Sequence, residues 1–344
     1  MKNNKKLLGL LAFALCNIIV FAQDSTVVKV KEMPWYMKGT VNGRIFANFH
    51  TSASELGKNK AFEVTRAYFG YDVDIDKNFS AAVKLDIGNP SDFKNSGELV
   101  VGRRFAFFKN AYLQYKYENL KVQFGIADAF QFKVQEKAWG YRYIMASFQD
   151  VYKYGSSADV GLFASYKFAD WLNADYSLIN GEGYGSVQMD DVLKNTLGVT
   201  VNPVKPLTIR VYADNYSISD SSQSTLATFV GVKFDKFNLG AEYNYQTNNA
   251  LVKGKDQSGY SVYGTYIISS KFKVLGRYDH LESVILEGKT STWNAKNDGD
   301  YLIGGLEYSP VKSVNFALNY QHKLAASIDY NDVATIFFNL QVSF

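Results

Sequence analysis

The chain has 344 residues, of which 37 are basic and 33 acidic, and its mean hydropathy is −0.17 even though it holds 25 Tyr and 25 Phe. Its only cysteine is Cys16, so disulfide frameworks and sites built from several thiolates are excluded. The small excess of basic residues gives no reason to expect nucleic acid as a partner. What remains is an aromatic-rich chain without a long apolar run after residue 21.

The first residues have the form of a secretory signal. Lys2, Lys5 and Lys6 precede an apolar run over residues 7–21, and the small residue Ala22 follows. The run is shorter than the roughly 20 residues that a membrane-spanning helix needs. We therefore expect a signal peptide over residues 1–22, a short periplasmic segment over 23–36 and one domain over 37–344. Removing the three lysines brings the basic and acidic residues close to equal numbers.

Alternation of apolar and polar residues dominates the chain beyond residue 37. At the C-terminus the apolar set is Ile336, Phe338, Leu340, Val342 and Phe344. Thr335, Asn339 and Gln341 lie on the opposite face, and the same pattern recurs over 120–126, 237–246 and 314–321. A period of two residues predicts strands with one apolar and one polar face.

Counting such segments predicts about sixteen strands. They span residues 40–50, 62–75, 79–88, 107–117, 120–130, 157–168, 171–180, 193–201, 207–217, 225–234, 237–247, 258–268, 272–281, 300–308, 313–323 and 333–344. Their connections alternate between short and long, with predicted long loops over 51–61, 89–106, 131–156, 181–192, 218–224, 248–257, 282–299 and 324–332. This rhythm is typical of bacterial outer-membrane barrels, whose periplasmic turns are short and whose extracellular loops are long.

We therefore predict an all-β fold, a single closed antiparallel transmembrane β-barrel in the bacterial outer membrane. A secreted β-sandwich, whose polar face would lie outside, is the alternative. The five prolines, at positions 34, 90, 203, 206 and 310, fall outside the predicted strands, where proline is tolerated because it cannot donate to a sheet. Large apolar residues such as Phe79, Trp171 and Phe272 flank the short turns. They predict either an interfacial aromatic girdle or hairpins held by cross-strand aromatic pairs.

Several segments resemble the phosphate-selective porin O/P family, in the version found in Bacteroidetes. They are Arg-Ala-Tyr-Phe-Gly at 66–70, Lys-Leu-Asp-Ile-Gly at 84–88, and Ser-Leu-Ile-Asn-Gly-Glu-Gly-Tyr at 177–184. The resemblance is strongest over residues 40–190 and implies a sixteen-stranded, often trimeric porin. The terminal Phe344 resembles the tail that the barrel-assembly machinery recognises.

The predicted function is passive diffusion of small hydrophilic solutes or ions through a water-filled barrel, with a weak preference for anions and phosphate among the candidates. In porins of this type the third long loop folds inward and narrows the pore, although it could instead lie over the outer rim. The predicted pore-lining and constriction residues are Arg44, Arg66, Lys84, Lys116, Lys121, Lys133, Lys137, Arg142, Lys153 and Arg210. Expected partners are outer-membrane lipid, small solutes or inorganic anions, the assembly machinery and two further copies of the chain.

Two other functions compete with a pore. An outer-membrane hydrolase would need catalytic groups, and His50, His280 and His322 show no recognisable catalytic spacing. A non-conducting structural or adhesin-type barrel is the second alternative. We expect no enzyme activity, no cofactor and no metal.

Overall fold

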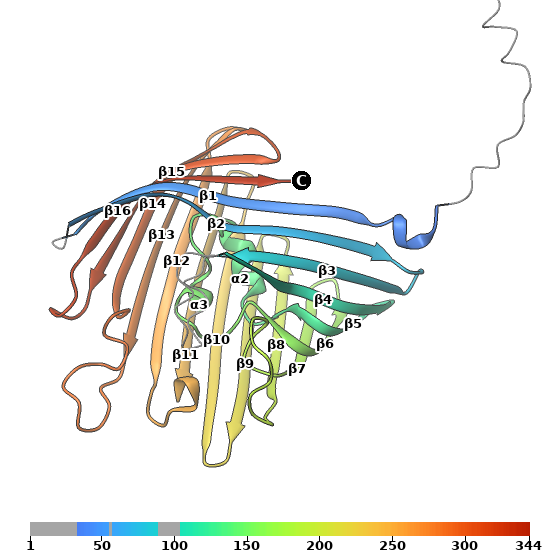
Figure 1. Cartoon of the computed structure of the whole chain (residues 1–344), viewed down its shortest axis with the longest axis horizontal. Helices are drawn as coiled ribbons and strands as arrows, with labels where there is room; N and C mark the ends of the chain where they lie inside the picture. The colour runs from blue at the N-terminus through green and yellow to red at the C-terminus, as the bar shows by residue number, and fades with distance from the viewer. Residues whose placement is uncertain (1–32, 55–56, 89–103) are drawn as a thin grey trace, which may run out of the picture.

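Sixteen antiparallel strands close into one barrel (Figure 1). The computed structural model describes residues 33–54, 57–88 and 104–344. The strands are β1 (Thr40–Ser54), β2 (Gly57–Asp74), β3 (Phe79–Gly88), β4 (Phe105–Tyr117), β5 (Leu120–Asp128), β6 (Ala158–Ala169), β7 (Leu172–Ile179), β8 (Lys194–Val204), β9 (Leu207–Ile218), β10 (Ser221–Lys233), β11 (Phe237–Thr247), β12 (Gln257–Ile267), β13 (Phe272–Ser283), β14 (Gly299–Val311), β15 (Val314–Ala325) and β16 (Val333–Ser343).

Each strand pairs with its neighbours in sequence, and β1 pairs with β16. Closure leaves no bare strand edge, which a structure surrounded by lipid requires because unpaired backbone groups are costly there. The predicted fold class and number of strands are therefore confirmed. The predicted signal peptide lies outside the described residues, and of the predicted lead-in only residues 33–36 are described, with a 3-10 turn, η1, at Trp35–Met37.

Two connections predicted as long loops are short. β1 continues to Ser54 and β2 begins at Gly57, whereas β9 and β10 are separated only by Ser219 and Asp220. Serine, threonine and asparagine are read as loop residues in sequence, but here they support the pairing. Ser222, for example, is bound by the hydroxyl of Ser217 and the amide of Asn215, both at 2.8 Å. Strands that rise above a bilayer need no apolar face, so composition underestimates their length.

Two prolines lie inside strand bounds, contrary to the sequence prediction. Pro203 belongs to β8 and Pro310 to β14. In both places the pairing register shifts, between Val201 and Val204 and between Tyr308 and Val311. A proline at such an irregularity breaks no regular ladder, since no hydrogen-bond donor is needed from it there.

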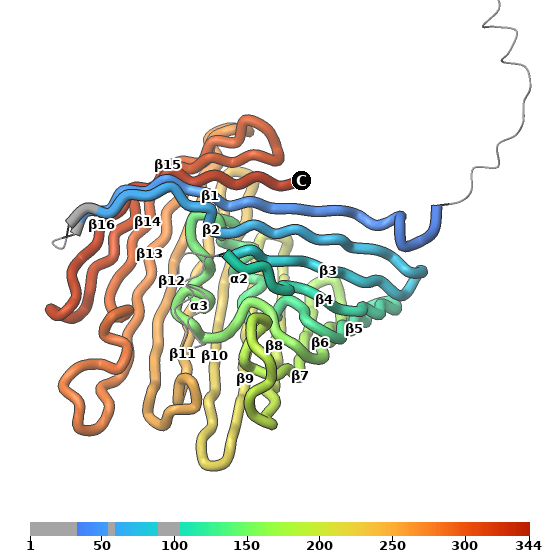
Figure 2. Tube along the Cα trace, in the orientation of Figure 1, coloured from blue at the N-terminus to red at the C-terminus, as the bar shows by residue number. Residues whose placement is uncertain are grey.

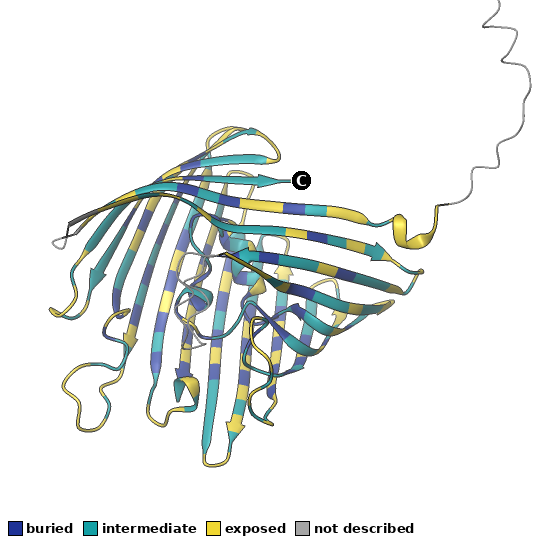
Figure 3. Cartoon of the chain, in the orientation of Figure 1, coloured by how far each residue is buried: buried dark blue, intermediate teal, exposed yellow. Residues whose placement is uncertain are grey.

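Buried and exposed residues alternate along the strands (Figure 3), and many of the exposed strand residues are large apolar side chains on the outer surface. On β15, Leu318 is 57% exposed, whereas its inward neighbours Ala317 and Asn319 are 0% and 2% exposed. The aromatic pairs Phe234–Phe237 and Phe272–Tyr308 flank short turns with ring centroids 4.8 and 4.9 Å apart. These rings are 37–48% exposed, so the same residues pair adjacent strands, β10 with β11 in one case and β13 with β14 in the other, and face the interface. The apolar exterior and the fold place the barrel in the bacterial outer membrane.

This assignment of faces predicts a large cost for a charge on the outer surface. Leu318→Arg, near the middle of β15, is expected to lower the free energy of unfolding in lipid vesicles by about 2–4 kcal/mol. The uncharged control Leu318→Met conserves volume and is expected to cost less than about 1.5 kcal/mol. Urea titration of both variants measures the difference. Equal stability of the two variants would contradict a lipid-facing Leu318.

Residues 129–157, which we call the inner loop, connect β5 to β6 and lie within the ring of strands (Figures 1 and 2). The inner loop contains α2 (Lys133–Trp139) and α3 (Phe148–Val151). Its buried rings Trp139, Tyr141 and Tyr143 pack against inward side chains that include Phe46 on β1 and Tyr263 on β12. The protein core is therefore the contact between the inner loop and the barrel wall. Within the described residues, no helix is long and apolar enough to cross a membrane.

Candidate functional site

Side chains of the wall hold the inner loop by its backbone carbonyls. The donor–carbonyl pairs are Arg210 to Phe130 (2.8 Å), Tyr263 to Gln135 (3.0 Å), Asn238 to Ala138 (2.5 Å), Asn339 to Tyr143 (3.1 Å), Arg277 to Ala146 (2.6 Å) and Gln246 to Tyr154 (2.9 Å). The donors come from strands between β9 and β16. Buried carbonyls need such partners, so the inner loop is fixed along its length to this side of the barrel.

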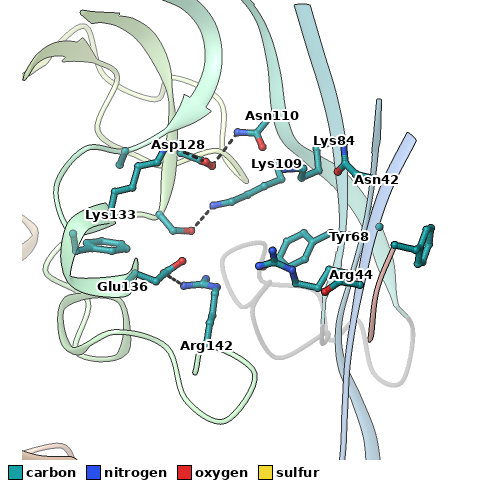
Figure 4. Close-up of a pocket in the computed structure, with 16 residues that line it drawn as sticks. Asn42, Arg44, Tyr68, Lys84, Lys109, Asn110, Asp128, Lys133, Glu136 and Arg142 are labelled. Carbon is teal, nitrogen blue, oxygen red and sulfur yellow. Dashed lines mark hydrogen bonds and ion pairs between the residues drawn. The ribbon is translucent and has the colours of Figure 1, made fainter. Parts of the chain in front are cut away.

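The opposite side, formed by β1 to β4, keeps open space. A narrow cavity of about 270 Å³ lies between this wall and the inner loop (Figure 4). Its wall side chains include Asn42, Arg44, Tyr68, Lys84, Lys109 and Asn110, and the inner loop contributes Phe132, Lys133, Glu136 and Arg142. A wide cavity of about 510 Å³ follows on the same four strands toward the short turns, lined by Thr40, Asp72, Ala82, Tyr112 and Gln114 among others. We call the two cavities together the passage.

The narrow cavity carries more positive than negative side chains. Five basic residues line it against two acidic ones, Asp128 and Glu136. Both carboxylates are engaged, because Lys133 lies 3.6 Å from Asp128 and Arg142 forms a salt bridge with Glu136. Within the part of the chain that the structure describes, neither Arg44 nor Lys84 forms a salt bridge.

Arg142 joins the two helices of the inner loop. Its guanidinium binds Glu136 on α2 and lies 2.7 Å from Asp150 on α3. Burial alone would raise the pKa of the Asp150 carboxyl. The charge and hydrogen bond of Arg142, together with the charges of Lys109 and Lys153, outweigh burial and hold that pKa below its usual range. Arg142 is thus half-buried and neutralised while one edge still faces the narrow cavity.

Four of the ten predicted site residues line the narrow cavity: Arg44, Lys84, Lys133 and Arg142. Arg66 lies beyond it on β2 and pairs with Asp86 at 2.6 Å. Lys116 and Lys121 face each other in the register of β4 and β5. Lys137 and Lys153 are exposed residues of the inner loop that line neither cavity of the passage.

Arg210 points inward but does not face open space. Its side chain is 1% exposed and makes two bonds to Asp175, at 2.7 and 2.9 Å, besides the bond to the Phe130 carbonyl. The start of the inner loop covers it. Arg210 therefore anchors the inner loop instead of lining the passage.

Sequence reasoning missed Lys109. Strict alternation on β4 would place it outward together with Ala111 and Leu113. The register shifts there, because Lys84 pairs with Asn110 whereas Leu85 pairs with Phe108. Lys109 is the extra residue of this bulge, and both it and Asn110 turn inward with 6% and 3% exposure. A signal existed, since a lysine on the lipid face would be costly.

The three histidines do not converge. His50 lies inside the barrel beside Asn48, whereas His280 lies on the outer face 2.7 Å from Asp300. His322, also on the outer face, contacts the ring of Tyr320. In residues 33–54, 57–88 and 104–344 no group of three His, Cys, Asp or Glu side chains could hold a metal ion.

No family model and no curated protein sequence matches the chain. Solved structures do match it over most of its length. The chain is similar to OprB of Pseudomonas putida, with 9% identity, a TM-score of 0.69 and coverage of 89% of this chain and 94% of that one. The fold is that of the outer-membrane porins. Salmonella typhi OmpF in complex with daunomycin matches at 12% identity and a TM-score of 0.67, covering 89% of this chain and 97% of that one. An anion-selective porin from Comamonas acidovorans matches at 11% identity and a TM-score of 0.62, covering 89% and 99%.

Proposed function

We propose that the chain forms a water-filled outer-membrane pore for the passive diffusion of small hydrophilic solutes and that this pore prefers anions, with phosphate among them. The observation that carries the proposal is the charge of the narrow cavity, where Arg44 and Lys84 form no salt bridge with any of the described residues. A porin of the same fold from Comamonas acidovorans is anion-selective, which is consistent with this proposal.

The arrangement acts as a charged filter. A solute that enters from the loop end passes between the wall of β1 to β4 and the inner loop, where the positive side chains attract anions and repel cations. The low-dielectric barrel wall strengthens these interactions. Because Asp128 and Glu136 lie in the same cavity, the preference is expected to be modest. The inner loop is the constriction in this proposal.

Reconstitution in a planar bilayer tests the proposal. Under a KCl gradient the purified protein is expected to conduct. Its reversal potential is expected to have the same sign as the equilibrium potential of chloride. Adding phosphate to the chloride solution is expected to reduce the chloride current if phosphate occupies the same cationic cavity. A reversal potential of the opposite sign would refute the anion preference. Absence of conductance would favour the non-conducting structural barrel, and hydrolytic activity of the purified protein would favour an enzyme.

The proposal includes the maturation and assembly of the barrel. It has three parts: residues 1–22 are removed, the barrel forms a homotrimer, and the assembly machinery recognises the last strand. Phe344 supports the recognition of the last strand. It exchanges two backbone hydrogen bonds with Gly43 of β1, at 2.8 and 3.0 Å, and thereby extends the pairing of β1 with β16 that closes the barrel. N-terminal sequencing and the native mass of the detergent-extracted protein test the first two.

A further inference from the structure

Tyr184 extends along the inside of the barrel from the connection between β7 and β8, past β6 and β5, to the wall of β2, β3 and β4. Its hydroxyl donates to Asp86 Oδ2 at 3.0 Å and lies 3.4 Å from a guanidinium nitrogen of Arg66. Its ring centroid lies 5.4 Å from that of Phe107, and the Lys109 ammonium lies 4.2 Å from it over the ring face. One side chain of this connection thus contacts four inward side chains of a part of the wall that begins three strands away from β7.

These four contacts lie next to the narrow cavity, on its extracellular side. β3 runs toward the loop end, so Asp86 lies two residues beyond Lys84 in that direction. β2 and β4 run the opposite way. Arg66 therefore lies two residues nearer the extracellular end than Tyr68, and Phe107 lies two residues nearer that end than Lys109. Since Lys84, Tyr68 and Lys109 line the narrow cavity, Tyr184 stands directly above it.

The connection that carries Tyr184 is held in place. Gly181 and Gly183 have φ values of 107° and 85°, a backbone region that disfavours other residues. Their N–H groups both donate to Asp159, which is 3% exposed, at 3.1 and 3.2 Å. The Tyr184 N–H donates to the Ala158 carbonyl at 3.0 Å. The backbone turn is therefore pinned to the start of β6, which aims the tyrosine side chain at the passage.

The contacts of Tyr184 affect both width and charge. The ring occupies space on the inner side of the wall beside Phe107, and its face covers the Lys109 ammonium, a favourable cation–π arrangement. The hydroxyl supplies a hydrogen bond to the Asp86 carboxylate, which also pairs with Arg66 at 2.6 Å. A carboxylate that is bonded in this way is a weaker barrier to anions than one without donors.

We propose that Tyr184 forms a second, outer constriction and is a specificity-determining residue of the passage, an inference that rests on the proposed pore function. Its ring limits the width of the passage on the extracellular side. Its hydroxyl, together with Arg66, keeps the Asp86 carboxylate from repelling anions. The inner loop and Tyr184 then act in series on each solute.

Two variants separate the two roles in planar-bilayer recordings. Tyr184→Ala removes the ring, and single-channel conductance in KCl is expected to rise roughly twofold. Tyr184→Phe keeps the ring but removes the donor to Asp86, so conductance is expected to stay close to the parent value while the chloride-to-potassium permeability ratio falls. Tyr278→Ala is the matched control, because Tyr278 also donates to an aspartate, Asp300 at 2.7 Å, but does so on the outer face of the barrel. Heat-modifiable gel mobility shows that each variant is folded.

The outcomes distinguish this inference from the proposed function. If the parent protein conducts with anion preference and the conductance of Tyr184→Ala equals that of the parent, the outer constriction is refuted but the proposed pore function is not. An unchanged permeability ratio in Tyr184→Phe refutes the role of the hydroxyl. A rise in conductance in Tyr278→Ala equal to that in Tyr184→Ala also refutes the outer constriction, and a parent protein that does not conduct overturns both proposals.

Discussion

Replacing Arg44 and Lys84 together by glutamate is expected to turn the anion preference of the pore into a cation preference. The double substitution changes the narrow cavity from five basic and two acidic side chains to three basic and four acidic ones. Each charge at about 4 Å is worth roughly 1 kcal/mol in water and several times more in a partly shielded site. We therefore expect the chloride-to-potassium permeability ratio to fall at least about tenfold, since 1.4 kcal/mol corresponds to a factor of ten. The reversal potential in a KCl gradient measures this change.

A control with the same change in net charge tests whether position matters. Lys137 and Lys153 are exposed lysines of the inner loop that line neither cavity of the passage. Lys137→Glu combined with Lys153→Glu is expected to shift the permeability ratio much less than the first pair, because added distance and water screen these charges. Equal shifts for the two pairs would show that selectivity follows net charge and would contradict a filter in the narrow cavity.

The closed barrel could be predicted because lipid imposes one rule on every strand. An apolar residue at every second position, as in residues 336–344, has to face outward once the strand is surrounded by lipid, and closure follows because no edge can stay bare. The rule weakens where strands leave the bilayer. The Ser217–Ser222 contact shows this, because hydroxyl pairs continue a ladder that composition had assigned to a loop.

The site was harder to predict, because alternation shows which residues point inward but not which of them meet water. Arg44 and Arg210 are equivalent in sequence, each an arginine on the polar face of a strand. They differ only through the inner loop, which covers Arg210 and leaves Arg44 beside open space. The alternation of residues within one strand does not show which inward side chains the inner loop covers, because residues 129–157 contact strands from both ends of the chain.

Two further side chains of the passage depend on irregular or distant structure. Lys109 faces inward only because of a bulge that shifts the register by one residue. Tyr184 meets Arg66, which lies 118 positions earlier in the chain. The position of the Tyr263 ring depends on the absence of a side chain at Gly240, because a Cβ there would lie 2.4 Å from the ring. The hydroxyl of Tyr263 donates to the inner loop. Such contacts are properties of the assembled barrel.

Arg210→Met is expected to destabilise the barrel by about 3–5 kcal/mol, because it leaves a buried carboxylate without its partner. Asp175 is 5% exposed and loses two bonds from the guanidinium, and the Phe130 carbonyl at the start of the inner loop loses its donor. A Cβ on Gly198 would lie 2.4 Å from both Arg210 and Asp175, so this ion pair fills the space above that glycine. Urea unfolding in lipid vesicles, followed by tryptophan fluorescence, measures the loss.

Two comparisons separate burial from simple loss of charge. Lys167→Met breaks an exposed ion pair with Asp170, whose side chains are 51% and 96% exposed, and is expected to cost less than about 1 kcal/mol. Arg210→Met combined with Asp175→Leu removes the orphaned carboxylate and is expected to restore most of the lost stability. The restored barrel would still lack the donor to Phe130, so its inner loop should remain looser and its single-channel current noisier than that of the parent. If Arg210→Met proves as mild as Lys167→Met, Arg210 does not anchor the inner loop.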